Sequence, residues 1–81
     1  MTINQAFAIR VREILKEKGM TQYKLSLETG IYHSTLNYIL NYKTKSSNFK
    51  TMALIIRALG VSIAEFFDSP IFNFNNLEID Y

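Results

Sequence analysis

The side chains best suited to chemistry in this sequence lie in one short stretch near its centre, and they suit hydrogen bonding rather than catalysis. His33, Asn37 and Asn41 follow an i, i+4, i+8 spacing, and Ser34 and Tyr38 occur beside them. That spacing places side chains on one face of a helix. A helix face that only contacts solvent is usually rich in Lys and Glu, whereas these residues offer uncharged donors and acceptors. The pattern predicts a surface that recognises the polar groups of another molecule.

The composition argues against catalysis and metal binding. The chain has 81 residues, no cysteine and one histidine, so it lacks the usual ligands of a zinc site. No serine, histidine and carboxylate arrangement is visible, and so short a chain has little apolar mass to spare for a deep substrate cavity. We therefore expect no catalytic residues, no metal, no cofactor and no small-molecule ligand.

No segment of the sequence is suited to a membrane. The longest uninterrupted apolar run, residues 52–56, has five residues, whereas a membrane-spanning helix needs about 20. Residues 1–10 lack the basic-then-apolar pattern of a secretory signal. We expect a cytoplasmic protein with no membrane contact.

Charge is distributed unevenly along the chain, although the net charge is only +2. Residues 1–64 carry all nine basic side chains and three acidic ones, a net charge of +6, whereas residues 65–81 carry four acidic side chains and no basic one. A basic body suggests an anionic partner, and an acidic tail suggests a separate role. A random distribution of surface charge would look the same, so the charges alone do not decide.

Hydrophobic spacing and helix-end signals divide residues 1–68 into five short helices. In the first, apolar residues follow an i, i+4, i+7, i+8 spacing, and Gly19 comes after its last basic residues, as a helix C-terminus prefers. Thr21 and Ser62 favour a helix N-cap. We expect helices at residues 4–18, 22–29, 33–40, 49–59 and 63–67. The residues expected on their inner faces are Phe7, Val11, Ile14, Leu15, Leu25, Leu36, Ile39, Leu40, Met52, Leu54, Ile55, Ile56 and Leu59.

Residues 21–41 have the pattern of a helix, a glycine-containing turn and a second helix. Gly30 lies where a sharp reversal needs a left-handed or uncrowded backbone. The second helix has an apolar inner face and the polar outer face described above, and the loop after it is basic and rich in hydroxyl groups. These are the requirements of a helix-turn-helix, which places its second helix in the major groove of DNA.

Taken together, these features resemble the lambda-repressor-like, Cro-type helix-turn-helix domains of phage repressors and bacterial regulators, the xenobiotic-response-element family. The resemblance covers residues 7–68 and implies an all-α, five-helix fold, with a DNA-binding domain at residues 1–68. It is carried by Gly19-Met20-Thr21-Gln22, Leu25, Thr29-Gly30-Ile31, Ser34-Thr35-Leu36, Asn41, Lys43-Thr44-Lys45 and Arg57-Ala58-Leu59-Gly60-Val61-Ser62.

The resemblance implies a sequence-specific regulator of transcription, such as a repressor, that binds double-stranded DNA as a homodimer on an inverted repeat. The residues implied to face base edges are His33, Ser34, Asn37 and Tyr38. The residues implied to contact phosphates are Gln22, Thr35, Asn41, Lys43, Thr44 and Lys45. For His33, a metal ligand and a plain surface residue remain alternatives, and Asn41 could also cap its helix.

Three features depart from the family pattern. Tyr32 stands where such domains usually cap the recognition helix with Ser or Thr, and Tyr42 replaces the usual glycine after Asn41. Many members pair an Arg near the end of the first helix with a Glu at the end of the recognition helix, and Leu15 and Leu40 occupy those positions here. We expect the two leucines to touch, because an apolar contact can replace a buried ion pair.

Residues 69–81 form an acidic, aromatic tail for which the family supplies no role. Apolar residues alternate on either side of Asn75-Asn76, a pair that tolerates a two-residue turn, so a short β-hairpin is one expectation. The apolar face of such a hairpin would pack either on the first and fifth helices or against a two-fold mate, and a frayed chain end is the alternative to the hairpin. The residues expected to make a dimer, through this tail or the fifth helix, are Phe66, Phe67, Phe72, Phe74, Leu77 and Ile79.

A second class of function remains open. A module of this fold can bind protein instead of DNA, as an antitoxin-like or adaptor domain, with the acidic aromatic tail as its partner surface. The absence of arginine from residues 33–40 favours this interpretation slightly, because arginine to guanine is the commonest specific contact with DNA.

Overall fold

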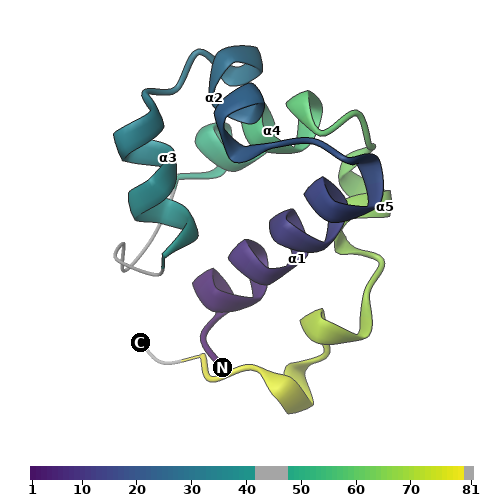
Figure 1. Ribbon diagram of the computed structural model, residues 1–81. Helices are drawn as coiled ribbons and strands as arrows, with labels where there is room; N and C mark the ends of the chain where they lie inside the picture. Colours follow the sequence, from purple (N-terminus) through teal and green to yellow (C-terminus); the bar gives the residue numbers. More distant parts are fainter. Residues whose placement is uncertain (42–47, 80–81) are drawn as a thin grey trace.

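Five α-helices account for most of the residues that the structure describes (Figure 1). The computed structural model describes residues 1–41 and 48–79. The helices are α1 (Ile3–Lys18), α2 (Gln22–Thr29), α3 (His33–Leu40), α4 (Phe49–Ala58) and α5 (Ile63–Phe67). Two 3₁₀ turns, η1 (Pro70–Phe72) and η2 (Phe74–Asn76), follow, and these described ranges contain no sheet. The all-α, five-helix fold is confirmed, and each helix end lies within one residue of its expected position.

Side-chain caps determine where α2 and α5 begin. The Thr21 hydroxyl accepts a hydrogen bond from the Lys24 N–H at 3.1 Å, and Ser62 and Glu65 form a reciprocal capping box at α5. Such bonds satisfy N–H groups that have no partner inside the helix. At α3, by contrast, Tyr32 precedes the helix and makes no side-chain cap bond. The start of α3 is therefore held by packing and by the preceding turn.

All five helices contribute to one apolar core. Leu15 and Leu40, which are 8% and 0% exposed, are both members, so α1 and α3 share this core at the positions expected to touch. The expected inner faces of α1, α2 and α3 are confirmed, whereas Met52 and Leu54 of α4 are only half-buried. The buried members are Phe7, Ala8, Val11, Ile14, Leu15, Leu25, Leu36, Ile39, Leu40, Ile55, Ile56, Leu59 and Phe66.

Three basic side chains of α1 bind the C-terminal ends of three other helices. Arg10 donates to two carbonyls at the end of α5, at 2.7 and 3.0 Å. Arg12 donates to the last carbonyl of α3 at 2.7 Å, and Lys18 donates to the carbonyl of Gly60, just after α4, at 3.4 Å. The last carbonyls of a helix lack intrahelical partners and carry partial negative charge. Each cation therefore stabilises the helix end that it meets.

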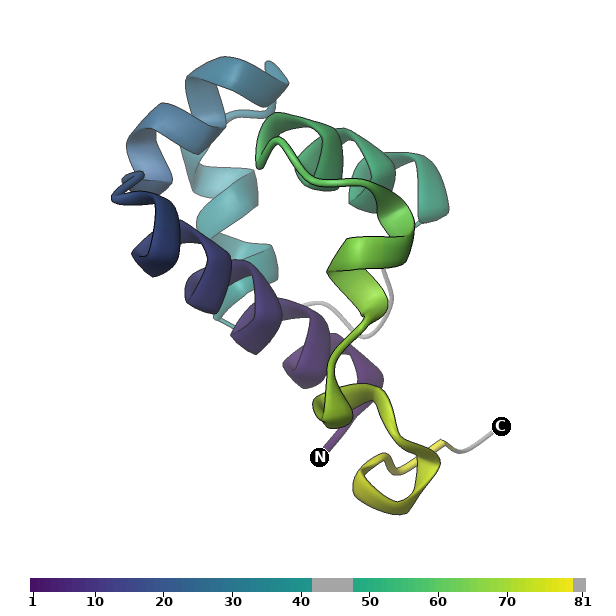
Figure 2. The same ribbon diagram turned by 90° about the vertical axis from the view of Figure 1, so that its right-hand side faces the viewer.

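The expectation of a C-terminal β-hairpin is wrong for the described residues. Residues 74–76 form the 3₁₀ turn η2 instead of a hairpin loop, and no strands pair across it. The tail returns to the start of α1, where the Glu78 N–H donates to the Met1 carbonyl at 2.8 Å and Thr2 pairs with Glu78 in an isolated parallel bridge. Figure 2 shows the tail beside the N-terminus.

The packing of Phe72 explains why the hairpin is displaced. Its ring centroid lies 4.9 Å from that of Phe67 and 6.0 Å from that of Phe66, both on α5. An isolated hairpin is marginal in water, whereas each apolar side chain placed against an existing core gains burial energy. The tail thus packs on α1 and α5, which turns Phe72 inward and leaves Phe74 pointing to solvent.

Candidate nucleic-acid interface

The turn between α2 and α3 is built from local interactions. Gly30 has a φ of +75°, a left-handed backbone that a residue with a Cβ rarely adopts. The buried Ser26 hydroxyl donates to the Ile31 carbonyl at 2.6 Å, and the Thr29 hydroxyl accepts from the Ile31 N–H at 3.1 Å. These bonds set the direction in which α3 leaves α2. The sequence patterns did not reveal the part played by Ser26, because a serine inside a short helix carries no distinctive signal.

The outer face of α3 is exposed along its length. The four side chains expected to read bases, His33, Ser34, Asn37 and Tyr38, are all exposed, whereas the apolar side chains of α3 are buried. Thr35 is also exposed. The fold therefore gathers the polar set on one face, as the helical spacing predicted, and Figure 1 shows α3 at the edge of the molecule.

A series of hydrogen bonds connects this face to α2 and α1. Gln22 Nε2 donates to Asn37 Oδ1 at 3.2 Å, and Asn41 Nδ2 donates to the same Oδ1 at 2.9 Å and to the Asn37 carbonyl at 2.8 Å. Arg12 Nη2 in turn donates to Asn41 Oδ1 at 3.2 Å. Because Asn37 Oδ1 already accepts two bonds, the Asn37 amide presents its NH₂ donors outward. Asn41 acts here at the helix end, which was one of its two expected roles.

The N-terminus of α2 lies next to this face. The backbone N–H groups of Gln22 and Tyr23 have no hydrogen-bond partner among residues 1–41 and 48–79. The Tyr23 ring centroid is 6.1 Å from that of His33, so the first turns of α2 and α3 are neighbours. Free amides at a helix N-terminus favour an anion. A phosphate placed here would be close to the polar face of α3.

Loss of the Arg12 guanidinium is expected to weaken both the fold and the α3 surface. An Arg12→Gln variant should lose about 1 kcal/mol of unfolding free energy, because the Leu40 carbonyl and Asn41 would lose a charged donor. Denaturant unfolding measures this change. Lys16→Gln is the matched control, since the Lys16 side chain is exposed on the same helix and binds no described residue. Equal stability of the two variants would contradict the role of Arg12.

The loop after α3 lies outside the described residues, so the structure does not place Lys43, Thr44 or Lys45. Arg10, Arg12 and Lys18 are engaged with helix ends. Part of the positive charge counted in the body therefore serves the fold.

The residues expected to form a dimer fall into three groups. Phe66 is fully buried in a single chain, so its side chain is a core residue and is not available to a partner. Phe67, Phe72 and Leu77 are half-buried. Phe74 and Ile79 are 79% and 58% exposed and lie on the surface.

Neither a metal site nor a membrane-spanning helix is found in the part of the chain that the structure describes. No group of three or more His, Cys, Asp or Glu residues is arranged to hold a metal ion there. None of the described helices combines the length and the apolar character needed to cross a membrane.

The segment that contains α2 and α3 matches the model of a known protein family. A family model of the Cro/C1-type HTH DNA-binding domain matches residues 10–70. This range begins within α1, includes the helix-turn-helix and ends at η1. No curated protein and no solved structure matched the chain.

Proposed function

Because this chain belongs to the family of Cro/C1-type HTH DNA-binding domains, we propose that it binds specific sequences of double-stranded DNA and regulates transcription, for example as a repressor. The observation that carries the proposal is the exposed polar face of α3, on which hydrogen bonds from Gln22 and Asn41 hold the Asn37 amide. Members of this family are DNA-binding domains rather than enzymes. We expect it to act in the cytoplasm of a bacterium, or on phage DNA there.

In the proposed complex, α3 lies in the major groove. His33, Ser34, Asn37 and Tyr38 face base edges there. The outward NH₂ group of Asn37 selects acceptors, which the major groove offers as purine N7, guanine O6 and thymine O4. This supports a readout by hydrogen-bond donors even though α3 carries no arginine.

The backbone contacts in the proposal surround this helix. A phosphate binds at the N-terminus of α2, where the Gln22 side chain and the free amides both donate. Asn41 must release one of its bonds to Asn37 before it can donate to a phosphate. The full proposed set is Gln22, Thr35, Asn41, Lys43, Thr44 and Lys45.

We further propose that residues 1–68 recognise one half-site and that residues 69–81 help to pair two copies. A two-fold dimer matches an inverted repeat, with half-site centres about 34 Å apart. Phe74 and Ile79 support a role of the tail in pairing, because both are exposed on it.

Selection of bound sites from random duplex DNA tests the function. We expect the selected DNA to share a defined sequence that recurs as an inverted repeat. Binding should weaken steeply as the salt concentration rises, because phosphate contacts release counterions. Failure to enrich any sequence, together with weak binding at low salt, would refute DNA recognition.

Lysines in the loop after α3 are expected to contribute affinity without specificity. Lys43→Ala and Lys45→Ala should weaken binding to all DNA sequences about equally and should each lower the slope of log K against log salt by ~1. Titrations at several salt concentrations measure the slope. Lys16→Ala, an exposed lysine of α1, serves as the control. An unchanged slope for the Lys43 and Lys45 variants would remove both lysines from the phosphate contacts.

The second candidate is a protein-binding module of the same fold, of the antitoxin or adaptor type. It is favoured by the absence of arginine from α3 and by the exposed aromatic residue on the acidic tail. The selection experiment separates the two candidates, since a module that binds only protein enriches no DNA sequence.

A further inference from the structure

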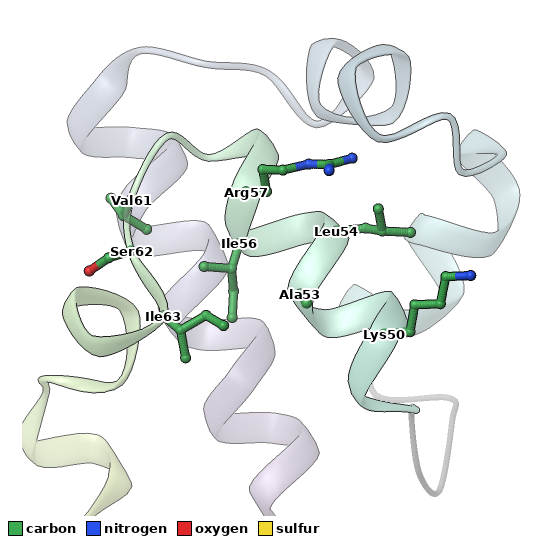
Figure 3. Close-up of a pocket in the computed structure, with 8 residues that line it drawn as sticks. All are labelled: Lys50, Ala53, Leu54, Ile56, Arg57, Val61, Ser62 and Ile63. Atoms are coloured by element: carbon green, nitrogen blue, oxygen red, sulfur yellow. The ribbon is translucent and has the colours of Figure 1, made fainter.

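An apolar groove lies between α4 and the start of α5 (Figure 3). Its volume is about 410 Å³, and Lys50, Leu54 and Arg57 are among the residues that line it. Figure 3 shows these three side chains on one side of α4, pointing away from Val61, Ser62 and Ile63. Neither cation binds any residue in the described part of the chain. The groove is therefore an apolar hollow edged by two unpaired positive charges. Its apolar lining is formed by Ala53, Leu54, Ile56, Val61 and Ile63.

The C-terminal tail has the complementary chemistry. Phe74, the first residue of η2, is 79% exposed, although Phe72 at the end of η1 packs against the core two residues earlier. The surrounding segment, residues 65–81, contains four acidic residues and no basic one. Of these, Glu65 caps α5 and Glu78 Oε1 lies 3.4 Å from the N-terminal amine of Met1, so the negative charge around Phe74 is partly used within the chain. A rigid, exposed aromatic side chain loses little conformational freedom when it is buried at an interface. An apolar side chain in an acidic segment thus matches an apolar groove with a cationic edge.

The tail does not reach the groove of its own chain. The Glu78 N–H donates to the Met1 carbonyl at 2.8 Å, which ties the tail to the start of α1. Figures 1 and 2 both show the tail beside the N-terminus, at the end of the molecule away from α4. Each other molecule of the same protein carries an identical tail, so a second copy of the chain can supply a side chain with this chemistry.

We propose that two copies form a reciprocal dimer in which Phe74 of each copy enters the α4–α5 groove of the other. The two contacts are equivalent, so a two-fold axis relates them and the pair closes. A standard interface covers about 800 Å² per partner, which is about one seventh of the surface of 5570 Å². The inference specifies the dimer of the proposed function, but its test needs no DNA.

Sedimentation of the full-length chain without DNA tests the dimer. Phe74→Asp on the tail and Arg57→Glu at the groove should each raise the dimer Kd by at least about tenfold, because one loses the apolar contact and the other repels the acidic tail. Leu27→Asp is the matched control: Leu27 is 66% exposed on α2, outside both surfaces. Circular dichroism shows whether each variant is folded.

Mixing two defective variants tests the reciprocal arrangement directly. In a mixture of Phe74→Asp and Arg57→Glu chains, the intact Phe74 of one variant can enter the intact groove of the other. A mixed pair keeps one of its two contacts intact, whereas a pair of identical variants keeps neither. The mixture should therefore form more dimer than either variant alone. An interface in which two tails contact each other predicts no effect of Arg57→Glu and no gain on mixing, and that result would overturn the proposal.

Binding to a single half-site separates this inference from the proposed function. If the dimer is as described, Phe74→Asp should bind an isolated half-site like the wild type and lose affinity only for the inverted repeat. Wild-type chains that remain monomeric at about 100 μM, where a Kd of ~1 μM would give mostly dimer, would overturn the dimer and leave half-site recognition untouched. Loss of all DNA binding by a chain that still dimerises would instead refute the proposed function.

Discussion

A Leu15→Arg variant is expected to lose about 3 kcal/mol of unfolding free energy, because it places an unpaired charge in the core between α1 and α3. Leu15 is 8% exposed and Leu40 is fully buried in the same apolar cluster. Small domains have only about 5–15 kcal/mol of stability, so a loss of this size is readily measured by denaturant unfolding.

A second substitution, at Leu40, tests whether the loss of stability arises from contact between the side chains at positions 15 and 40. Adding Leu40→Glu to Leu15→Arg should restore part of the lost stability, since the two side chains can then form the ion pair found in many members of the family. Leu27→Arg is the control for the charge itself, because Leu27 is exposed on α2. If Leu15→Arg were as stable as this control, the two leucines would not face each other.

The largest expected effect on function comes from the residues of α3 that face outward. His33→Ala and Tyr38→Ala should each reduce discrimination at particular base pairs by ~1–3 kcal/mol, which corresponds to roughly 5- to 150-fold. Affinity for unrelated DNA should hardly change, because phosphate contacts supply it.

Site selection with each variant measures this loss base pair by base pair. His33 opens α3 and Tyr38 lies more than one turn later, so the two variants should relax different positions of the half-site. Leu27→Ala provides an exposed control on α2. Identical selected sites for all four proteins would remove both residues from base recognition.

The helices and the polar face could be predicted because their signals are local. Thr21 caps α2 within one turn, Gly30 supplies a left-handed residue where the chain reverses, and the spacing from His33 to Tyr38 defines one helix face. Each of these features depends on residues close together in the sequence. Such signals survive in any compact arrangement of the chain.

The tail could not be predicted in the same way. Asn75 and Asn76 suit a hairpin loop and a 3₁₀ turn almost equally, so local preference does not choose between them. The choice is made by distant partners, since Phe72 packs on α5 and Glu78 binds the backbone at the start of α1. The same packing explains why Phe66 is a core residue and why Phe74 remains exposed.

By itself, therefore, the sequence determined five helices, their order, the buried faces of α1, α2 and α3, and the polar outer face of α3. Only the tertiary structure decided how the charges are used: Arg10, Arg12 and Lys18 bind the ends of helices that lie at least 28 residues away along the chain. It also linked Gln22, Asn37 and Asn41 into one hydrogen-bonded series and left Lys50 and Arg57 beside an open groove. The physical reason is that periodicity and capping act within a few residues, whereas the partner of a long charged side chain depends on which helix ends the folded core brings within its reach.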